Sequence, residues 1–120
     1  MMFRIKKEFH FSASHQLSHL AADHQCANLH GHNYIAVVEL SAANLNDDGF
    51  VRDYLELKPL KEYIDENFVH RHLNDVLDVH TTAENIAKHL YDWCKERWPE
   101  TSAVAVSETP KTWAEYKPAG

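Results

Sequence analysis

Apolar and polar residues alternate along the beginning of the chain. From position 3 to position 15, the odd-numbered residues are mostly aromatic or aliphatic, and the even-numbered residues are charged or polar. The odd-numbered residues that carry the pattern are Phe3, Ile5, Phe9, Phe11, Ala13 and His15. A period of two predicts a strand over residues 3 to 15 with one buried face.

A second alternating run extends from His32 to about Leu45. Its buried parity is formed by Tyr34, Ala36, Val38 and Leu40. Ile35 and Val37 make the other parity partly apolar as well, which predicts a strand that is covered on both faces.

The period changes to that of a helix after a turn signal at residues 46–49, Asn-Asp-Asp-Gly. Asp53 and Glu56 have the spacing of a helix start. The stripe that follows consists of Leu57, Leu60, Ile64 and Phe68. Pro59 is compatible with this helix only in its first turn. The pattern therefore predicts a first helix that ends near Phe68.

A second helix is predicted from Thr81, which has capping-box spacing to Glu84, to about Trp98, just before Pro99. Its inward residues are Ile86, Ala87, Leu90, Trp93 and Cys94. Residues 103–107 then predict a third strand, and residues 112–116 a weaker fourth strand.

The predicted order is strand, strand, helix, helix, strand, strand in one domain that covers residues 1–120. Two helices on one face of a four-stranded antiparallel sheet make an α+β domain. The first two strands are long for so small a domain, so we expect their outer face to need a partner subunit.

Composition excludes several classes of function. The net charge is −6 and the basic residues are scattered, which argues against a nucleic-acid-binding surface. The N-terminal residues contain no apolar signal core, and no run is long enough to cross a membrane. Cys26 and Cys94 alone do not form a disulfide framework. We therefore expect a reduced, cytoplasmic protein, in which ten histidines are the unusual feature.

Three of these histidines predict a metal site. His30 and His32 lie two apart and share a strand face, and His15 ends the first strand where they begin the second. An isolated His-x-His is more often two polar residues on an exposed face. The position of His15 favours zinc instead, with an open coordination position that is typical of catalytic sites.

Other candidate residues allow more than one interpretation. Cys26 is a base or nucleophile near the cation, a fourth structural ligand, or an inert thiol. Cys94 lies on an apolar helix stripe and receives no function. His70 fits a helix C-terminal cap better than a proton shuttle. Glu108 shares parity with buried strand residues, so it is either solvated or a bidentate acceptor for a flat heterocycle.

Together these segments resemble the family of 6-pyruvoyl- and 6-carboxy-tetrahydropterin synthases. The matching segments run in family order along nearly the whole chain. They are residues 11–15 (FSASH), 26–32 (CANLHGH), 53–58 (DYLELK), 70–74 (HRHLN), 82–85 (TAEN) and 107–109 (SET).

The resemblance implies a tunnelling fold (T-fold), in which three subunits form a barrel and two barrels stack into a homohexamer with active sites at subunit interfaces. It implies that His15, His30 and His32 bind zinc. It also implies that Cys26 is the general base, His70 its relay partner, and Glu108 with Thr82 the residues that bind the pterin.

The implied substrate is 7,8-dihydroneopterin triphosphate. The short gap between Cys26 and His30 resembles the 6-carboxy branch, which releases acetaldehyde and triphosphate and serves 7-deazaguanine and queuosine synthesis. A 6-pyruvoyl synthase, a zinc module with weakened catalysis and a zinc hydrolase are the alternatives. The chain departs from the family at Val69, where relatives usually have an aspartate that orients the relay histidine. Candidate substitutes are Asp53, Asp75 and Asp78, including their copies in a neighbouring subunit, or a water.

Overall fold

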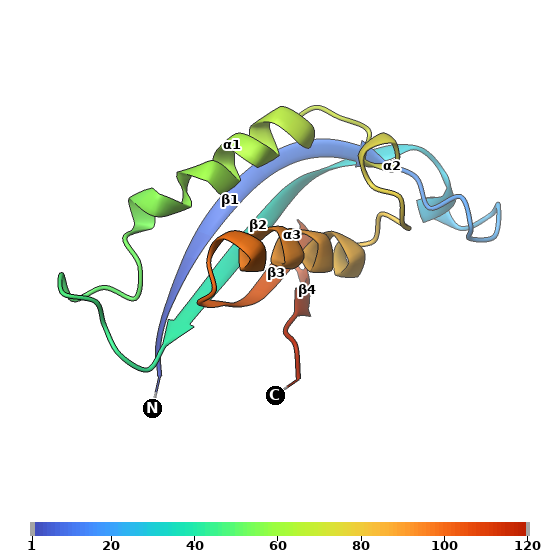
Figure 1. The fold of residues 1–120 in the computed structure, drawn as a ribbon. Helices are drawn as coiled ribbons and strands as arrows, with labels where there is room; N and C mark the ends of the chain where they lie inside the picture. Colours follow the sequence, from blue (N-terminus) through green and yellow to red (C-terminus); the bar gives the residue numbers. More distant parts are fainter. Residues whose placement is uncertain (1, 120) are drawn as a thin grey trace.

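The computed structural model describes residues 2–119, and in it four antiparallel strands form one sheet in the order β1-β2-β3-β4 (Figure 1). The strands are β1 (Phe3–His15), β2 (His30–Ala42), β3 (Thr101–Thr109) and β4 (Thr112–Tyr116). The predicted bounds of the first and fourth strands are confirmed. The fold class predicted from the sequence is also confirmed.

The bounds of β2 and β3 differ from the prediction. β2 begins at His30 rather than His32 and ends at Ala42 rather than Leu45, because Phe3 pairs with Ala42 and β1 offers no partner further along. β3 extends on both sides of residues 103–107, since it pairs with β2 on one edge and with β4 on the other.

The two main helices, α1 (Lys58–Asn67) and α3 (Ala83–Arg97), lie against the same face of the sheet (Figure 1). Three shorter elements accompany them: the 3-10 turns η1 (Gln25–Ala27) and η2 (Tyr54–Leu57), and the single-turn helix α2 (Leu73–Val76). Asp53 caps η2, not α1. Thr82 rather than Thr81 is the N-cap of α3 and accepts a hydrogen bond from Asn85 N–H, so the predicted capping box was wrong by one residue.

The core lies between the helices and the even-numbered face of β2. Its largest fully buried side chains include Tyr34, Leu40, Leu60, Phe68 and Leu90. Ile35 and Val37 on the opposite face of β2 are only partly buried, and neither α1 nor α3 covers that face. No helix in residues 2–119 has the length and apolar character that crossing a membrane requires.

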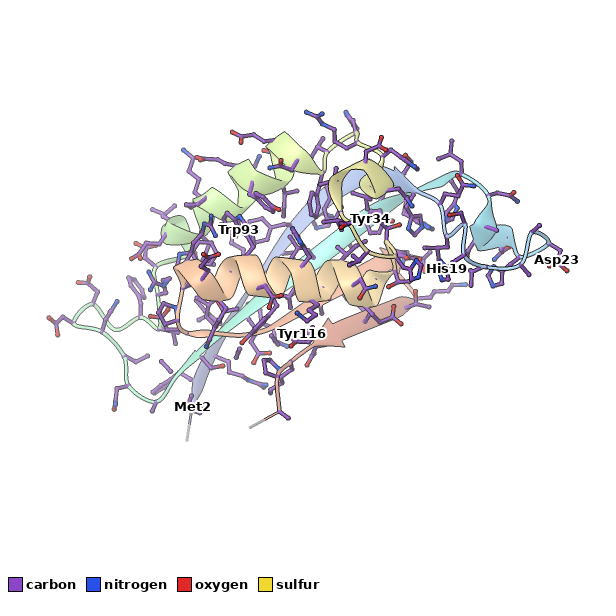
Figure 2. All side chains as sticks on the ribbon, turned by 45° about the vertical axis from the view of Figure 1, so that its right-hand side comes forward. Met2, His19, Asp23, Tyr34, Trp93 and Tyr116 are labelled. Atoms are coloured by element: carbon purple, nitrogen blue, oxygen red, sulfur yellow. The ribbon has the colours of Figure 1, made fainter. Side chains whose placement is uncertain are left out.

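The loop between β1 and β2 carries Cys26 and projects beyond one end of the sheet. Figure 2 shows Asp23 at the outer tip of this loop and His19 close to the start of α3. The rings of His19 and His80 stack there with centroids 3.6 Å apart, which attaches the loop to the segment that precedes α3.

Candidate metal centre and substrate pocket

The three predicted ligands come together where β1 ends and β2 begins. His15 lies directly opposite His30 in the strand register, and His32 lies opposite Ala13, so all three imidazoles are on the helix-covered face. One ring nitrogen from each lies within 4.8 Å of the other two. His15 is fully buried, and His30 and His32 are half-buried.

Backbone carbonyls determine the tautomers of two of these histidines. His15 Nδ1 lies 2.7 Å from the carbonyl oxygen of Thr81, and His30 Nδ1 lies 2.7 Å from that of Asn28. Because a carbonyl can only accept, both Nδ1 atoms carry the proton. Both Nε2 atoms therefore present lone pairs, as a metal-ligating histidine with a bonded Nδ1 does.

The Nε2 lone pairs have no protein donor to satisfy them. His15 Nε2 and His30 Nε2 are 2.8 Å apart and are both acceptors. His32 Nε2 is buried and has no hydrogen-bond partner within residues 2–119. The convergent lone pairs of His15 and His30, with the unpartnered Nε2 of His32 beside them, fit a bound cation, so these residues suit a metal ion.

Burial favours the neutral form of two of these imidazoles. It lowers the pKa of His15 and of His32, although the Glu108 carboxylate opposes the change at both. A neutral imidazole is the form that binds a metal.

Beside the histidines is a pocket of about 310 Å³ that contains the two predicted pterin-binding residues. Its lining includes Leu17, Thr82, Glu108 and Thr112. The Glu108 carboxylate lies 3.6 Å from His32 Nε2, and its side chain is 25% exposed. The interpretation of Glu108 as a solvated residue is therefore wrong, because its carboxylate lies beside His32 and lines the pocket.

Nearly the whole chain matches a known protein family. Residues 4–119 match the profile of the family described as 6-pyruvoyl tetrahydropterin synthase. The chain belongs to this family. The resemblance inferred from the sequence motifs is thus confirmed, and the sheet with its helices is the family's T-fold.

Several members of this synthase family resemble the chain over nearly its whole length. The 6-carboxy-5,6,7,8-tetrahydropterin synthase of Bacillus subtilis is 31% identical over 97% of this chain and 86% of its own. That of Synechocystis is 34% identical over 96% and 93%. The solved 6-pyruvoyl tetrahydropterin synthase of Caenorhabditis elegans superposes with a TM-score of 0.86 at 26% identity, covering 99% and 97%. The chain is accordingly a lyase-type enzyme similar to the 6-carboxy synthases.

In this synthase-family chain, Cys26 lies outside the group of converging ligand atoms. Within residues 2–119, that group contains only the three histidines. Cys26 is half-buried in η1, where its N–H donates to His24 Nδ1 and its carbonyl accepts from Leu17 N–H. The structure therefore gives the fourth-ligand interpretation no geometric support. The role of general base stays a prediction.

The other predicted catalytic residue of this chain, His70, lies beside the free edge of β1. It has a left-handed backbone conformation (φ 57°), and its N–H donates to the Ser12 carbonyl at the free edge of β1. It lines a cleft of about 590 Å³ with Ser12, Ser14 and Asn33 of the uncovered face of the sheet, and His32 also contributes to this lining. Within one chain, the structure does not bring His70 together with Cys26.

The structure does not supply His70 with any of the expected partners. α1 ends at Asn67, and the His70 ring makes no hydrogen bond or ion pair in the described part of the chain, so the helix-cap interpretation is not supported. Asp53, Asp75 and Asp78 make none with it either. Val69 is partly buried against the core.

Two residues of the site were missed by sequence reasoning. Thr81 supplies the carbonyl that orients His15, and no side-chain pattern identifies such a backbone acceptor. The Tyr34 ring lies against His15 and His32, with centroid distances of 6.0 and 5.5 Å. Its position two residues after His32, on the same strand face, was a signal that could have identified it. Burial raises the pKa of Tyr34, which keeps this neighbour of the ligands neutral.

Proposed function

We propose that the chain is a zinc-dependent 6-carboxy-5,6,7,8-tetrahydropterin synthase. It converts 7,8-dihydroneopterin triphosphate, with release of acetaldehyde and triphosphate, for 7-deazaguanine and queuosine synthesis. The observation that carries the proposal is the convergence of the Nε2 atoms of His15, His30 and His32 beside the Glu108 pocket. The names of the bacterial relatives favour the 6-carboxy product over the 6-pyruvoyl product.

Zinc is the ion that suits this site, because three neutral imidazoles and no further protein ligand are typical of catalytic zinc. When bound, zinc supplies a Lewis acid that makes the side-chain hydroxyls of the substrate more acidic. The chain holds the ligand rings in place for this through the Thr81 and Asn28 carbonyls.

In the pocket, we assign the pterin ring to Glu108 and Thr82. An amino-pyrimidinone edge presents two adjacent N–H donors, and a carboxylate can accept both at once. The Thr82 hydroxyl oxygen already accepts from Asn85 N–H, so its own hydrogen is free to be donated to an acceptor on the ring.

Glu108→Gln is expected to weaken the binding of a pterin analogue by about 5- to 150-fold, which is the ~1–3 kcal/mol of an unpaired buried group. The substitution keeps the shape but turns an N–H donor toward the donors of the ring. Fluorescence titration would measure the affinity. Glu115→Gln, on the exposed part of β4, is the matched control and should leave it unchanged. Equal affinities for the two variants would place Glu108 outside the pterin site.

Proton transfer is assigned to Cys26 as the base and His70 as its relay. Because one chain keeps these residues apart, the relay requires a His70 from a neighbouring subunit. This fits the proposed homohexamer of two stacked trimers. The free edges of β1 and β4 and the uncovered face of β2 are the surfaces available for such an assembly.

The proposal is tested by incubating the zinc-loaded protein with 7,8-dihydroneopterin triphosphate and trapping acetaldehyde as its hydrazone. We expect acetaldehyde and 6-carboxy-tetrahydropterin in equal amounts. Triphosphate release with a pyruvoyl product and no acetaldehyde would favour the 6-pyruvoyl alternative. If the protein binds zinc but does not consume the substrate, it is a zinc-binding module. If it only hydrolyses phosphate from the substrate, it is a hydrolase.

A further inference from the structure

Asn74 is the last residue of the 70–74 motif, and neither the metal site nor the pterin pocket accounts for it. The motif runs beside the free edge of β1, next to the point where β1 ends (Figure 1). His70 N–H donates to the Ser12 carbonyl at 2.7 Å, and Ser14 N–H donates to the Arg71 carbonyl at 3.0 Å. Edge pairing therefore uses alternate residues of β1, and the next outward-facing backbone groups along the chain belong to Gln16.

The side chain of Asn74 bonds both of those groups. Gln16 N–H donates to Asn74 Oδ1 at 2.9 Å, and Asn74 Nδ2 donates to the Gln16 carbonyl at 2.7 Å. The two contacts fix the orientation of the amide, because the N–H needs an oxygen and the carbonyl needs a donor. The Asn74 side-chain amide thus makes the two hydrogen bonds that a paired strand residue would make, and it continues the edge pairing of β1 one residue beyond His15.

From Gln16, hydrogen bonds lead to the segment that carries Cys26. The Gln16 side chain donates from Nε2 to the Ala27 carbonyl at 2.8 Å. Leu17 N–H donates to the Cys26 carbonyl at 2.9 Å. The backbone around Cys26 is therefore held by the two residues that follow His15, and the first of these is the one that Asn74 holds.

A second set of contacts leads from Asn74 to the metal-ligating ring of His15. The Thr81 hydroxyl donates to Asn74 Oδ1 at 3.3 Å, and the Thr81 carbonyl accepts from His15 Nδ1 at 2.7 Å. Thr81 is fully buried, so its position is well constrained. One amide side chain thus contacts both the segment that orients the His15 ring and the segment that begins the Cys26 loop.

We propose that Asn74 is a positioning residue that fixes the Cys26 segment relative to the His15 imidazole. The inference rests on the proposed roles of Cys26 and of the three-histidine site. It does not depend on which pterin is the substrate. Without Asn74, the Gln16 backbone loses both partners at once and the loop is free to shift against the metal site.

The experiment compares Asn74→Ala with the wild type by two measurements that need no substrate. The absorption spectrum of the cobalt-substituted protein reports the geometry around the histidines. The rate at which iodoacetamide alkylates Cys26 in the zinc-loaded protein reports the placement of the thiol. Cys94 does not interfere, because it is fully buried and burial raises the pKa of its thiol to about 12.

We expect Asn74→Ala to change both the cobalt spectrum and the alkylation rate, and to weaken zinc binding by about 10- to 100-fold, as the loss of an outer contact to a ligand does. Asn67→Ala is the control, since Asn67 Nδ2 also donates to a backbone carbonyl, that of Tyr63 in α1, and makes no hydrogen bond to Gln16 or Thr81 in residues 2–119. It should leave all three quantities as in the wild type.

Asn74→Asp provides a second variant if the alanine protein does not fold. It keeps the acceptor for Gln16 N–H and for Thr81 but sets an oxygen against the Gln16 carbonyl, so an altered alkylation rate is expected again. A folded Asn74 variant with the wild-type spectrum and rate would overturn the proposal, and so would a change in only one of the two. If the wild type binds neither zinc nor cobalt, the proposed function fails. In that case the alkylation rate of Cys26 is compared between the metal-free wild type and the metal-free Asn74 variant, and equal rates would overturn this inference separately.

Discussion

Cys26→Ala is expected to lose turnover by about 10²- to 10⁴-fold, the usual contribution of an acid–base group, while it keeps one zinc per chain. The reason is geometric. The thiol belongs to η1 and lies outside the group of converging histidine nitrogens in residues 2–119, so its removal leaves the ligand set intact. Steady-state kinetics and elemental analysis of the same preparation give the two quantities.

Cys94→Ala is the matched control for this prediction. Cys94 is buried on the core face of α3, where no catalytic role is expected, so its replacement should lower the thermal stability but leave both turnover and zinc content unchanged. Loss of zinc together with activity in Cys26→Ala would instead make Cys26 a fourth ligand. Wild-type turnover would remove it from the mechanism.

His30→Ala is expected to lose both the metal and the activity. Two imidazoles remain, His15 and His32, and a pair with no third protein ligand holds zinc too weakly to survive dialysis against a chelator. Because His30 is only half-buried at the start of β2, the variant should still fold, which circular dichroism would verify. Elemental analysis after dialysis is the measurement.

The control for this second prediction is His10→Ala. His10 is an exposed histidine of β1 on the opposite face of the sheet, so its loss removes an imidazole without changing the site. It should retain a full equivalent of zinc. A His30→Ala protein that kept as much zinc as His10→Ala would show that the ligand assignment is wrong.

The parts of the fold that could be predicted are those that long periodic segments determine. The alternation in residues 3–15 gave the correct bounds of β1, and a return of the chain after a long loop placed His15 opposite His30. The apolar stripes of α1 and α3 likewise identified the helices that cover the sheet. In each case many residues repeat the same signal, so a single exception such as Lys7 does not change the result.

What could not be predicted depends on single contacts. α2 is one turn long, too short for a helical period, and the pairing of residues 70–72 with β1 leaves no pattern in the sequence. At Thr81-Thr82 both residues can cap a helix, and only tertiary packing decides the choice: Thr81 is buried, and its carbonyl orients His15. The position of Glu108 against His32 also depends on tertiary packing, which brings the end of β3 beside the start of β2.

Val69 stands where a resembling synthase usually has an aspartate that orients the relay histidine. Val69 is partly buried against the apolar core, where its side chain contributes packing and cannot orient an imidazole. Because the His70 ring has no hydrogen-bond or ion-pair partner in residues 2–119, we propose that a carboxylate of a neighbouring subunit or a water orients it. The relay is thus the part of the proposed mechanism that depends most on assembly.

X-ray absorption at the zinc edge tests the central claim most directly, because it counts and identifies the atoms around the metal without reference to activity. The account predicts a fit with three imidazole nitrogens at about 2.0–2.1 Å and no sulfur. A sulfur scatterer at about 2.3 Å, or a fit with fewer than three imidazoles, would contradict it.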